Sequence, residues 1–280
     1  MGIVVPVHDE EDLLPAALDA LTEAANHPRL DGRPVWLAVV LDACTDGSGA
    51  AAREGAAAFA RSGPGRHAVV VESPGANVGA ARRRGAVVVT PRLVRAGAGA
   101  WLATTDADSV VQPGWLARQL ARQSEGVEAW AGAVAVVDWA GRPAGLAARF
   151  RAAYHAGAAT GHVHGTSLGV SLAAYRAAGG FPPLRTGEDR ALWAALGRIG
   201  ARRVHDASCP VRTSARRAPQ ARAPEGFAGY LDALEAAGGA RQAASTPEEP
   251  PDLLAPTAPA QAAGCSTTLV QPSSRLSKWA

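Results

Sequence analysis

The sequence predicts an α/β fold in which a mostly parallel sheet is flanked by helices. Short apolar runs alternate with helical patterns over residues 2–105, which is typical of chains built from strand–helix–strand units. Acidic residues closely follow three of these apolar runs. In such sheets, ligands bind beyond the carboxyl ends of the strands. These acidic residues are therefore the first candidates for a functional site.

Four strands and three helices are expected in the first half of the chain. The first helix carries Leu14, Leu18 and Leu21 on one face, which is the spacing of an amphipathic helix. The third helix contains Pro91, which lacks an amide proton and can break the helix. The expected strands are residues 2–7, 35–41, 67–73 and 100–105, and the expected helices are residues 11–25, about 48–61 and 77–97.

The second half is less regular. Residues 128–139 fit a strand, residues 146–160 fit a helix, and residues 164–181 mix both signals. Residues 187–204 predict a helix followed by a short strand. From about residue 240 the chain is rich in Pro, Ala and Ser and lacks periodicity, so we predict a disordered tail over residues 241–280.

The composition favours a small ligand over nucleic acid. The 280 residues allow one large domain or two small ones. The net charge of +3 suits an anionic small molecule. Aromatic residues make up only 5% of the chain, whereas nucleic-acid binding is better supported by basic residues interleaved with aromatics. We expect no nucleic-acid partner.

The cysteines and the apolar runs bear on the compartment. Cys44, Cys209 and Cys265 are far apart and odd in number, and they show neither a zinc spacing nor a disulfide framework. No apolar run reaches the ~18 residues of a membrane span. The chain does not open on a basic segment followed by an apolar core. We expect a cytoplasmic protein with no signal peptide and no integral membrane segment.

Two aspartates stand one residue apart after the fourth expected strand. Asp106 and Asp108 are followed by the Pro113–Gly114 break. Two carboxylates held together repel each other, which raises the cost of keeping both ionised. A divalent cation relieves that cost, and hard oxygen ligands favour Mg²⁺ or Mn²⁺. A solvent-exposed turn in which Asp108 caps the next helix is the alternative.

Three further positions are candidates, each with a structural alternative. Glu188 and Asp189 stand at a loop-to-helix junction, where a carboxylate is well placed as a general base or simply favours the helix dipole. Asp42 can accept from a uracil imide or a ribose hydroxyl, or it can cap a turn. Arg82 is one of three consecutive arginines, of which one or two can reach a common ligand because helical neighbours diverge by about 100°.

Five motifs in this order resemble a family 2 glycosyltransferase of the GT-A fold. They are "VVPVHDEE", "LDACTDGS", "NVGAARRRG", "DAD" and "GGFPPLRTGEDRALWAAL", and the resemblance covers roughly residues 2–215. The first motif has Asp9 where the family usually has Asn, and the second has Leu41 in place of its first Asp. Each motif alone is weak, but the five together at suitable spacing are specific.

The resemblance implies an activity and a domain plan. The enzyme would move a sugar from a UDP- or GDP-linked donor to a hydroxyl of a small-molecule or glycan acceptor, with inversion at the anomeric carbon. A single catalytic domain with a GT-A, Rossmann-like sheet would span residues 1–240. Residues 1–110 would form its nucleotide-sugar-binding half and residues 111–240 its acceptor-binding half.

The resemblance also implies roles for the matched residues. Asp106 and Asp108 would hold Mg²⁺ or Mn²⁺ on the diphosphate, with Asp108 as the more direct ligand. Asp189, with Glu188 beside it, would deprotonate the acceptor hydroxyl. The donor-binding residues would be Pro6, Glu10, Asp42, Arg82 and Asp106, and the acceptor site would include His164, Gly165 and Thr166, although His162 and His164 can equally be structural.

The end of the catalytic domain departs from the family pattern. Many members carry a metal-contacting His there, whereas this chain reads "CPVRTSARRAP" and His205 lies slightly early. We therefore expect no His ligand. Arg212, Arg216 and Arg217 can contact the diphosphate or an anionic acceptor, or form a basic solvated loop.

Other functional classes were weighed against this one. A sugar-phosphate nucleotidyltransferase needs a Gly-rich N-terminal loop with a basic residue, and a nicotinamide dehydrogenase needs G-x-G-x-x-G after the first strand; neither is present. A catalytically silent nucleotide-sugar-binding or scaffold member remains open. Leu41 and the missing His favour that alternative, and the retained Asp189 opposes it.

Overall fold

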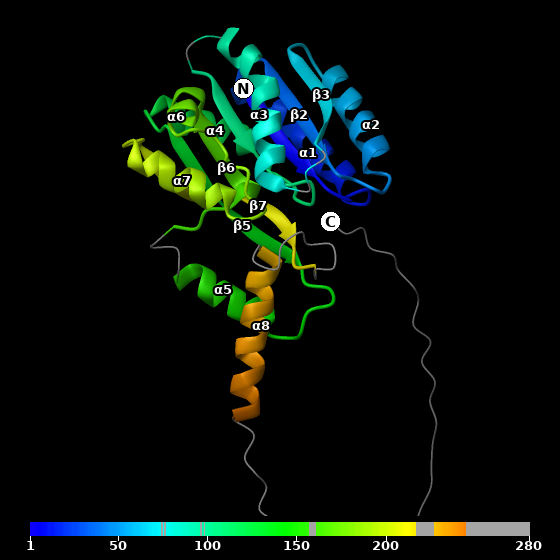
Figure 1. The fold of residues 1–280 in the computed structure, drawn as a ribbon, viewed down its shortest axis with the longest axis vertical. Coiled ribbons are helices and arrows are strands. Elements are labelled where there is room, and N and C mark those ends of the chain that lie inside the picture. The colour runs from blue at the N-terminus through cyan, green and yellow to red at the C-terminus, as the bar shows by residue number, and fades with distance from the viewer. Residues whose placement is uncertain are drawn as a thin grey trace, which may run out of the picture. The chain divides into compact units, whose positions relative to one another are not determined.

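The structure is a computed structural model that describes residues 1–73, 75, 77–95, 97, 99–156, 161–216 and 227–244 (Figure 1). The chain divides into two compact units, Met1–Glu235 and Ala236–Ala280. The first unit holds the sheet. Of the second, residues 236–244 are described, and they continue a helix past the predicted start of the tail at residue 241. The rest of the predicted tail lies outside the described residues.

Strands and helices alternate through the first half as expected, whereas in the second half two helices follow one another between the last two strands. The strands are β1 (Gly2–Val7), β2 (Val35–Asp42), β3 (Arg66–Ser73), β4 (Trp101–Thr104), β5 (Ala129–Asp138), β6 (Leu168–Ser171) and β7 (Arg203–Ser214). The α-helices are α1 (Leu14–Ala25), α2 (Ser48–Arg61), α3 (Val78–Arg95), α4 (Trp115–Ser124), α5 (Leu146–Ala156), α6 (Leu172–Ala177), α7 (Glu188–Arg198) and α8 (Phe227–Ala244), with short 3₁₀ turns η1 (Pro28–Leu30) and η3 (Gly165–Ser167).

The described strands form one seven-stranded sheet in the order β3-β2-β1-β4-β6-β5-β7. β1 pairs in parallel with β2 and β4, β2 with β3, and β5 with β7, whereas β6 is antiparallel to both of its neighbours. The mostly parallel sheet predicted from the sequence is therefore confirmed. The chain steps outward from β1 to β3 and then returns to the other side of β1. This reversal opens a crevice beyond the carboxyl ends of β1 and β4, where such sheets bind ligands.

Helices cover both faces of the sheet. All six residues of β1 are buried, as in parallel strands covered on both sides, and successive side chains point to opposite faces. Ile3 and Val5 pack in one apolar cluster with residues of α1, α2 and α4, whereas Val4 packs in a second cluster with residues of α3, α6 and α7. The alternation along β1 thus divides the core into two layers.

The break considered near Pro91 does not occur. Helix α3 runs from Val78 to Arg95 with Pro91 inside it. Proline removes the hydrogen bond to the carbonyl of residue i−4, which here is Val87. Pro91 is exposed and Val87 is 63% exposed, so water can take the place of the lost donor.

The start of α3 joins two motifs that are about 100 residues apart in the sequence. Asn77 caps the helix by accepting from the Ala80 amide at 2.9 Å, and its side-chain amide donates to the Pro183 carbonyl at 3.0 Å. The Gly79 amide donates to the Leu184 carbonyl at 3.0 Å. A Cβ at Gly79 would lie 2.8 Å from Leu184 backbone atoms. The glycine lets the loop that leads into α7 lie directly on α3.

None of the described helices is long and apolar enough to cross a membrane.

We expect Gly79→Ala to destabilise the protein by about 1–3 kcal/mol, because the new methyl group meets backbone that cannot move aside. Urea unfolding followed by circular dichroism measures the loss. Gly114→Ala is the matched control, since Gly114 has an ordinary φ of −80° and no atom within 4 Å of an added Cβ; because Gly114 is the N-cap of α4 and Ala is a poorer cap, the change should cost at most about 1 kcal/mol. Equal midpoints for the two variants would contradict the close packing at Gly79.

Candidate active site

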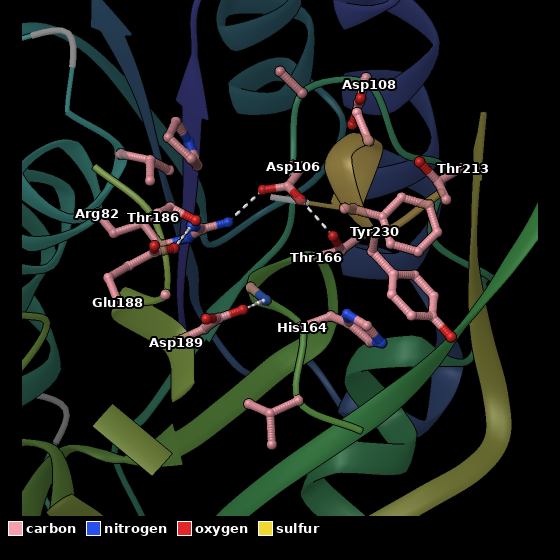
Figure 2. A pocket seen from close by; sticks show the side chains of 18 of the residues that line it. Arg82, Asp106, Asp108, His164, Thr166, Thr186, Glu188, Asp189, Thr213 and Tyr230 are labelled. Carbon is pink, nitrogen blue, oxygen red and sulfur yellow. Dashed lines mark hydrogen bonds and ion pairs between the residues drawn. The ribbon is translucent and has the colours of Figure 1, made fainter. Parts of the chain in front are cut away.

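A cavity of about 590 Å³ lies at the crevice beyond β1 and β4, a volume in the range of small-molecule sites. Its walls come from the ends of these strands, the first turns of α3 and α7, residues 161–166 and the end of β7 (Figure 2). The structure brings together all of the predicted site residues except Asp42. They are Pro6, Glu10, Arg82, Asp106, Asp108, His164, Gly165, Thr166, Glu188 and Asp189.

Arg82 is a buried charge of the cavity, with 3% of its surface exposed. Its guanidinium forms ion pairs with Glu188 and Asp106 (Figure 2). Its Nε donates to Thr104 Oγ1 at 3.2 Å. Burial works against the positive charge, but the neighbouring carboxylates outweigh it and raise the pKa of Arg82 above its usual value. Arg83 and Arg84 are exposed. One of the three consecutive arginines therefore turns inward, and it does so to meet two acids.

Glu188 differs from Asp189 in its surroundings. Glu188 is 3% exposed and its carboxylate is committed to Arg82. Asp189 accepts from the Gly165 amide at 2.7 Å through Oδ2 and from the Arg190 amide at 2.7 Å through Oδ1. Each oxygen of Asp189 keeps a further lone pair for a ligand. Of the two acids predicted as catalytic, Asp189 is the one held open to the cavity without an ion pair to Arg82.

Residues 165–166 pack against the ion pair of Arg82 and Asp106. Asp106 accepts from Arg82 through Oδ1 and from the Thr166 hydroxyl through Oδ2 (Figure 2). A Cβ at Gly165 would collide with the Arg82 guanidinium, so only glycine fits there. Of the three residues predicted for the acceptor site, Gly165 and Thr166 thus also position Asp189 and Asp106.

Asp108 and Glu10 share one cation, Arg216. Arg216 makes two hydrogen bonds to Glu10, one of them at 2.7 Å, and its Nη2 donates to Asp108 Oδ2 at 3.1 Å. Burial raises the pKa of Glu10 to about 7 against the opposing effect of Arg216, and the charges of Asp108 and Asp106 add to the rise. Burial also raises the pKa of Asp108. These carboxylates lie where a further positive charge would be favourable.

The basic residues near the end of the domain are placed differently from one another. Arg216 lines the cavity, Arg212 is not among the lining residues, and Arg217 lies outside the described residues. His205 packs against Trp193 with 4.9 Å between ring centroids and is also absent from the lining.

Asp42 does not reach the cavity. Its side chain is fully buried, and Oδ2 accepts from the Asn77 amide at 2.7 Å. It therefore holds the residue that caps α3. The predicted contact between Asp42 and the donor would therefore require this side chain to move.

The oxygen donors in the cavity fit Mg²⁺ or Mn²⁺. Asp106 and Asp108 present carboxylates, the ligands these ions prefer. Among the described residues, Arg216 is the only cation that forms an ion pair with Asp108.

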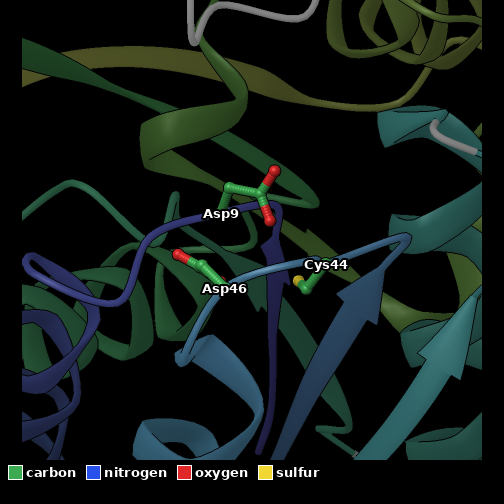
Figure 3. Close-up of side chains that lie close together, drawn as sticks. All are labelled: Asp9, Cys44 and Asp46. Atoms are coloured by element: carbon green, nitrogen blue, oxygen red, sulfur yellow. The ribbon is translucent and has the colours of Figure 1, made fainter.

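A second group, Asp9, Cys44 and Asp46, also has potential ligand atoms within 4.8 Å of one another (Figure 3). Asp9 accepts from the Thr45 amide and Asp46 from the Ser48 and Glu11 amides. This second group closes a turn between two loops.

Aromatic side chains line the cavity beside His164, and the sequence analysis did not identify most of them. They are Tyr154 on α5, His162, and Phe227 and Tyr230 on α8. His164 stacks near Tyr154 with centroids 5.8 Å apart and meets Phe227 edge-on at 6.0 Å. Spacing along the chain carries no signal for Phe227 and Tyr230, because α8 lies beyond residues 2–215, which the resemblance covers.

His164 carries a lowered pKa of about 4, chiefly because burial disfavours its charged form. A histidine with a folded pKa below its unfolded value of 6.5 lowers stability as the pH falls, since the unfolded chain then binds the proton. The groups whose charges act on it are Asp189, His162, Asp106 and Arg190.

We expect wild-type protein to lose about 3 kcal/mol more stability than His164→Gln between pH 6.5 and pH 4. Above about pH 7.5 the stability difference between the two proteins should not change with pH on account of this group, because the unfolded histidine is then also neutral. Urea unfolding at a series of pH values measures both curves. Parallel curves across this window would show that His164 is not buried as a neutral imidazole.

Comparison with known proteins places this site in a family. The family model described as "Glycosyl transferase family 2" matches residues 2–177. No curated protein sequence matches the chain. Among solved structures, the fold is similar to a mannosyltransferase from Pyrobaculum calidifontis, solved in complex with GDP-Man and Mn²⁺, with a TM-score of 0.54 and 21% identity over 89% of this chain. It is also similar to S. aureus TarS, with a TM-score of 0.53 and 14% identity over 76% of this chain.

The chain spans 65% of the length of the mannosyltransferase chain and 36% of the TarS chain. These likenesses confirm the predicted GT-A fold. The family match extends from β1 through α6 and includes Asp106 and Asp108. The protein is therefore a member of glycosyl transferase family 2.

Proposed function

We propose that the protein is a metal-dependent, inverting glycosyltransferase that uses Asp189 as its general base. The observation that carries this proposal is the position of Asp189. Its carboxylate is held by the Gly165 amide and lines the same cavity as Asp106 and Asp108. A base and a candidate metal site in one cavity suit the transfer of a sugar from a nucleotide diphosphate to a hydroxyl.

The donor would lie over the carboxyl ends of β1 and β4. Pro6, Glu10, Arg82 and Asp106 line that part of the cavity, and a UDP- or GDP-sugar is the donor class that the family resemblance implies. The similar Pyrobaculum mannosyltransferase, solved in complex with GDP-Man and Mn²⁺, supports this class. Asp42 would act on the donor through Asn77 and the start of α3, because its side chain is buried beneath them.

Asp108 and Asp106 would hold Mg²⁺ or Mn²⁺. When bound, such an ion supplies Lewis-acid stabilisation of the charge that develops on a leaving diphosphate. Arg216 now neutralises Asp108 and Glu10. On loading, its guanidinium would be free to turn to a diphosphate oxygen, for which its planar fork is suited.

The chain's own residues would carry out the proton transfer. The acceptor hydroxyl donates its proton to Asp189 as its oxygen bonds to the anomeric carbon, and the bond from that carbon to the diphosphate breaks. The negative charge leaves on the diphosphate. Attack from the face opposite the leaving group inverts the anomeric centre. Glu188 would act as a positioning residue, because it holds Arg82 and through it Asp106.

A nucleotide-sugar-binding member without turnover is the second candidate. It is favoured by Leu41, which replaces an acid of the family motif and is 6% exposed beneath α2. Both candidates bind a donor, so turnover separates them.

We expect one of UDP-, GDP- or TDP-sugars to raise the melting temperature by roughly 5–10 °C at 100 times its Kd, and only with Mn²⁺ or Mg²⁺ present. Differential scanning fluorimetry with and without EDTA measures the shift. ATP with the same metal serves as the control for non-specific phosphate binding. If no sugar nucleotide shifts the melting temperature, the proposed function is wrong.

We expect Asp189→Asn to lower transfer by about 100- to 10,000-fold, the usual worth of a general base. The melting shift with the donor should persist, because Asn can still accept from the Gly165 amide. A coupled assay of released nucleoside diphosphate, run with a panel of hydroxyl acceptors, measures the rate. Turnover equal to wild type would remove Asp189 from the base role. Donor binding without release by the wild type would favour the silent member.

A further inference from the structure

One side of the cavity is built from five ring side chains, which we call the aromatic wall. Tyr154 and His162 stack at 4.1 Å with an interplanar angle of 6°. His164 lies 5.9 Å from His162, and Phe227 lies 6.5 Å from Tyr230. All five line the cavity. Aromatic rings gathered at a cavity surface usually bind a ligand's apolar face.

Hydrogen bonds and packing against Phe150 hold the rings of the aromatic wall in place. The Val134 amide donates to the Tyr154 hydroxyl at 3.1 Å, and the Tyr154 carbonyl contacts His162 Nε2 at 2.9 Å. Phe150, which is 3% exposed, packs against Tyr154, Phe227 and Tyr230. Tyr230 itself is 39% exposed, although it is a large aromatic side chain. Its ring is therefore available to a ligand at the edge of a fixed surface.

His164 contributes a polar atom that has no partner. Its Nε2 is buried and forms no hydrogen bond with any described residue. An unsatisfied buried polar atom is costly, so a hydroxyl that reaches Nε2 would be favourable. A neutral imidazole can donate or accept there, according to its tautomer.

The aromatic wall adjoins the reacting groups of the proposed transferase. His164 is followed by Gly165, whose amide holds Asp189, and by Thr166, whose hydroxyl holds Asp106. Figure 2 shows His164 and Tyr230 on one side of the cavity and Asp189 and Arg82 on the other. A molecule lying on the wall would therefore be beside Asp189.

The chemistry of this side differs from that of the donor side. Tyr154, Phe227 and Tyr230 offer neutral faces, whereas the charged residues that line the cavity, namely Arg82, Arg185, Arg190, Arg216 and the carboxylates, belong to other segments. A ligand that suits the wall needs an apolar face for the rings. It also needs one hydroxyl for Asp189 and a second for His164 Nε2. A pyranose ring has both, with C–H bonds on a face and hydroxyls around the edge.

We propose that the aromatic wall is the acceptor subsite and that the acceptor is a neutral pyranoside, stacked on Tyr230 and Phe227 with one hydroxyl on His164. This rests on the proposed function, since Asp189 defines which hydroxyl reacts. The five rings offer apolar contact and no cation, so a carboxylated sugar would gain charge pairing only from Arg185 or Arg190, which line the cavity outside the wall. An acyclic polyol would present no rigid apolar face.

The test is ligand-observed saturation-transfer NMR on the full chain, with UDP or GDP and Mg²⁺ present to fill the donor side without reaction. The probes are methyl α-D-mannopyranoside and methyl β-D-glucopyranoside, compared with D-mannitol and D-glucuronate. At least one methyl pyranoside should bind about 10-fold more tightly than mannitol or glucuronate, with the strongest transfer to protons on one ring face. Preference for mannitol or for glucuronate would overturn the proposal.

Variants locate the site. Tyr230→Ala should weaken pyranoside binding about 3- to 10-fold, as expected for an aromatic contact, and Tyr230→Phe, the matched control, should bind within about 2-fold of wild type. His164 imidazole resonances of the wild type should shift with the pyranoside while those of exposed His67 do not, and this readout needs no variant. Equal binding by Tyr230→Ala and Tyr230→Phe, or no shift at His164, would overturn the proposal.

The two proposals fail in different ways. If UDP or GDP raises the melting temperature with metal but no pyranoside binds, the acceptor proposal is wrong and the donor side stands. If no UDP-, GDP- or TDP-sugar shifts the melting temperature, the proposed function is wrong and the acceptor proposal falls with it.

Discussion

The buried guanidinium of Arg82 is the interaction on which the site depends. It joins α3 to the segment after β4 through Asp106 and to the first turn of α7 through Glu188. Removing one partner of a buried ion pair leaves an uncompensated charge, which is strongly destabilising. These ion pairs fix the positions of the two halves of the cavity relative to each other. The guanidinium also packs against Gly165, whose amide donates to Asp189, so the position of Asp189 depends on Arg82 as well.

From Arg82 the cavity divides into a charged side and a neutral side. Glu10, Asp108 and Arg216 form one cluster in which a single cation serves two acids. The rings around His164 form the other, and the lowered pKa of that histidine keeps it uncharged at neutral pH. Residues 164–166 connect the two, because successive positions face the rings, Asp189 and Asp106. A donor with a diphosphate would bind on the charged side of the cavity, and an acceptor without charge would bind on the side of the rings.

Much of the site could be predicted because its signals are local. Asp106, Asp108 and Glu10 follow strands, and the ends of parallel strands converge whatever lies between them. Asp42 also stands at the end of a strand, but its side chain lies outside the cavity. A side chain at a strand end can point to either face of the sheet, and Asp42 points toward the amide of Asn77, from which it accepts a hydrogen bond. Arg216 was one of three basic candidates in its segment. Only its pairing with Glu10, 206 residues away in the sequence, singled it out.

The sequence by itself determined the family, the parallel sheet and the edge of the sheet at which the acids gather, since each follows from residues close together along the chain. The tertiary structure decided which of these acids are open. It assigned Glu188 to Arg82, left Asp189 facing the cavity, and brought Tyr154, Phe227 and Tyr230 to the side of His164. The reason is physical: burial and pairing of a side chain depend on distant segments, and no local spacing encodes them.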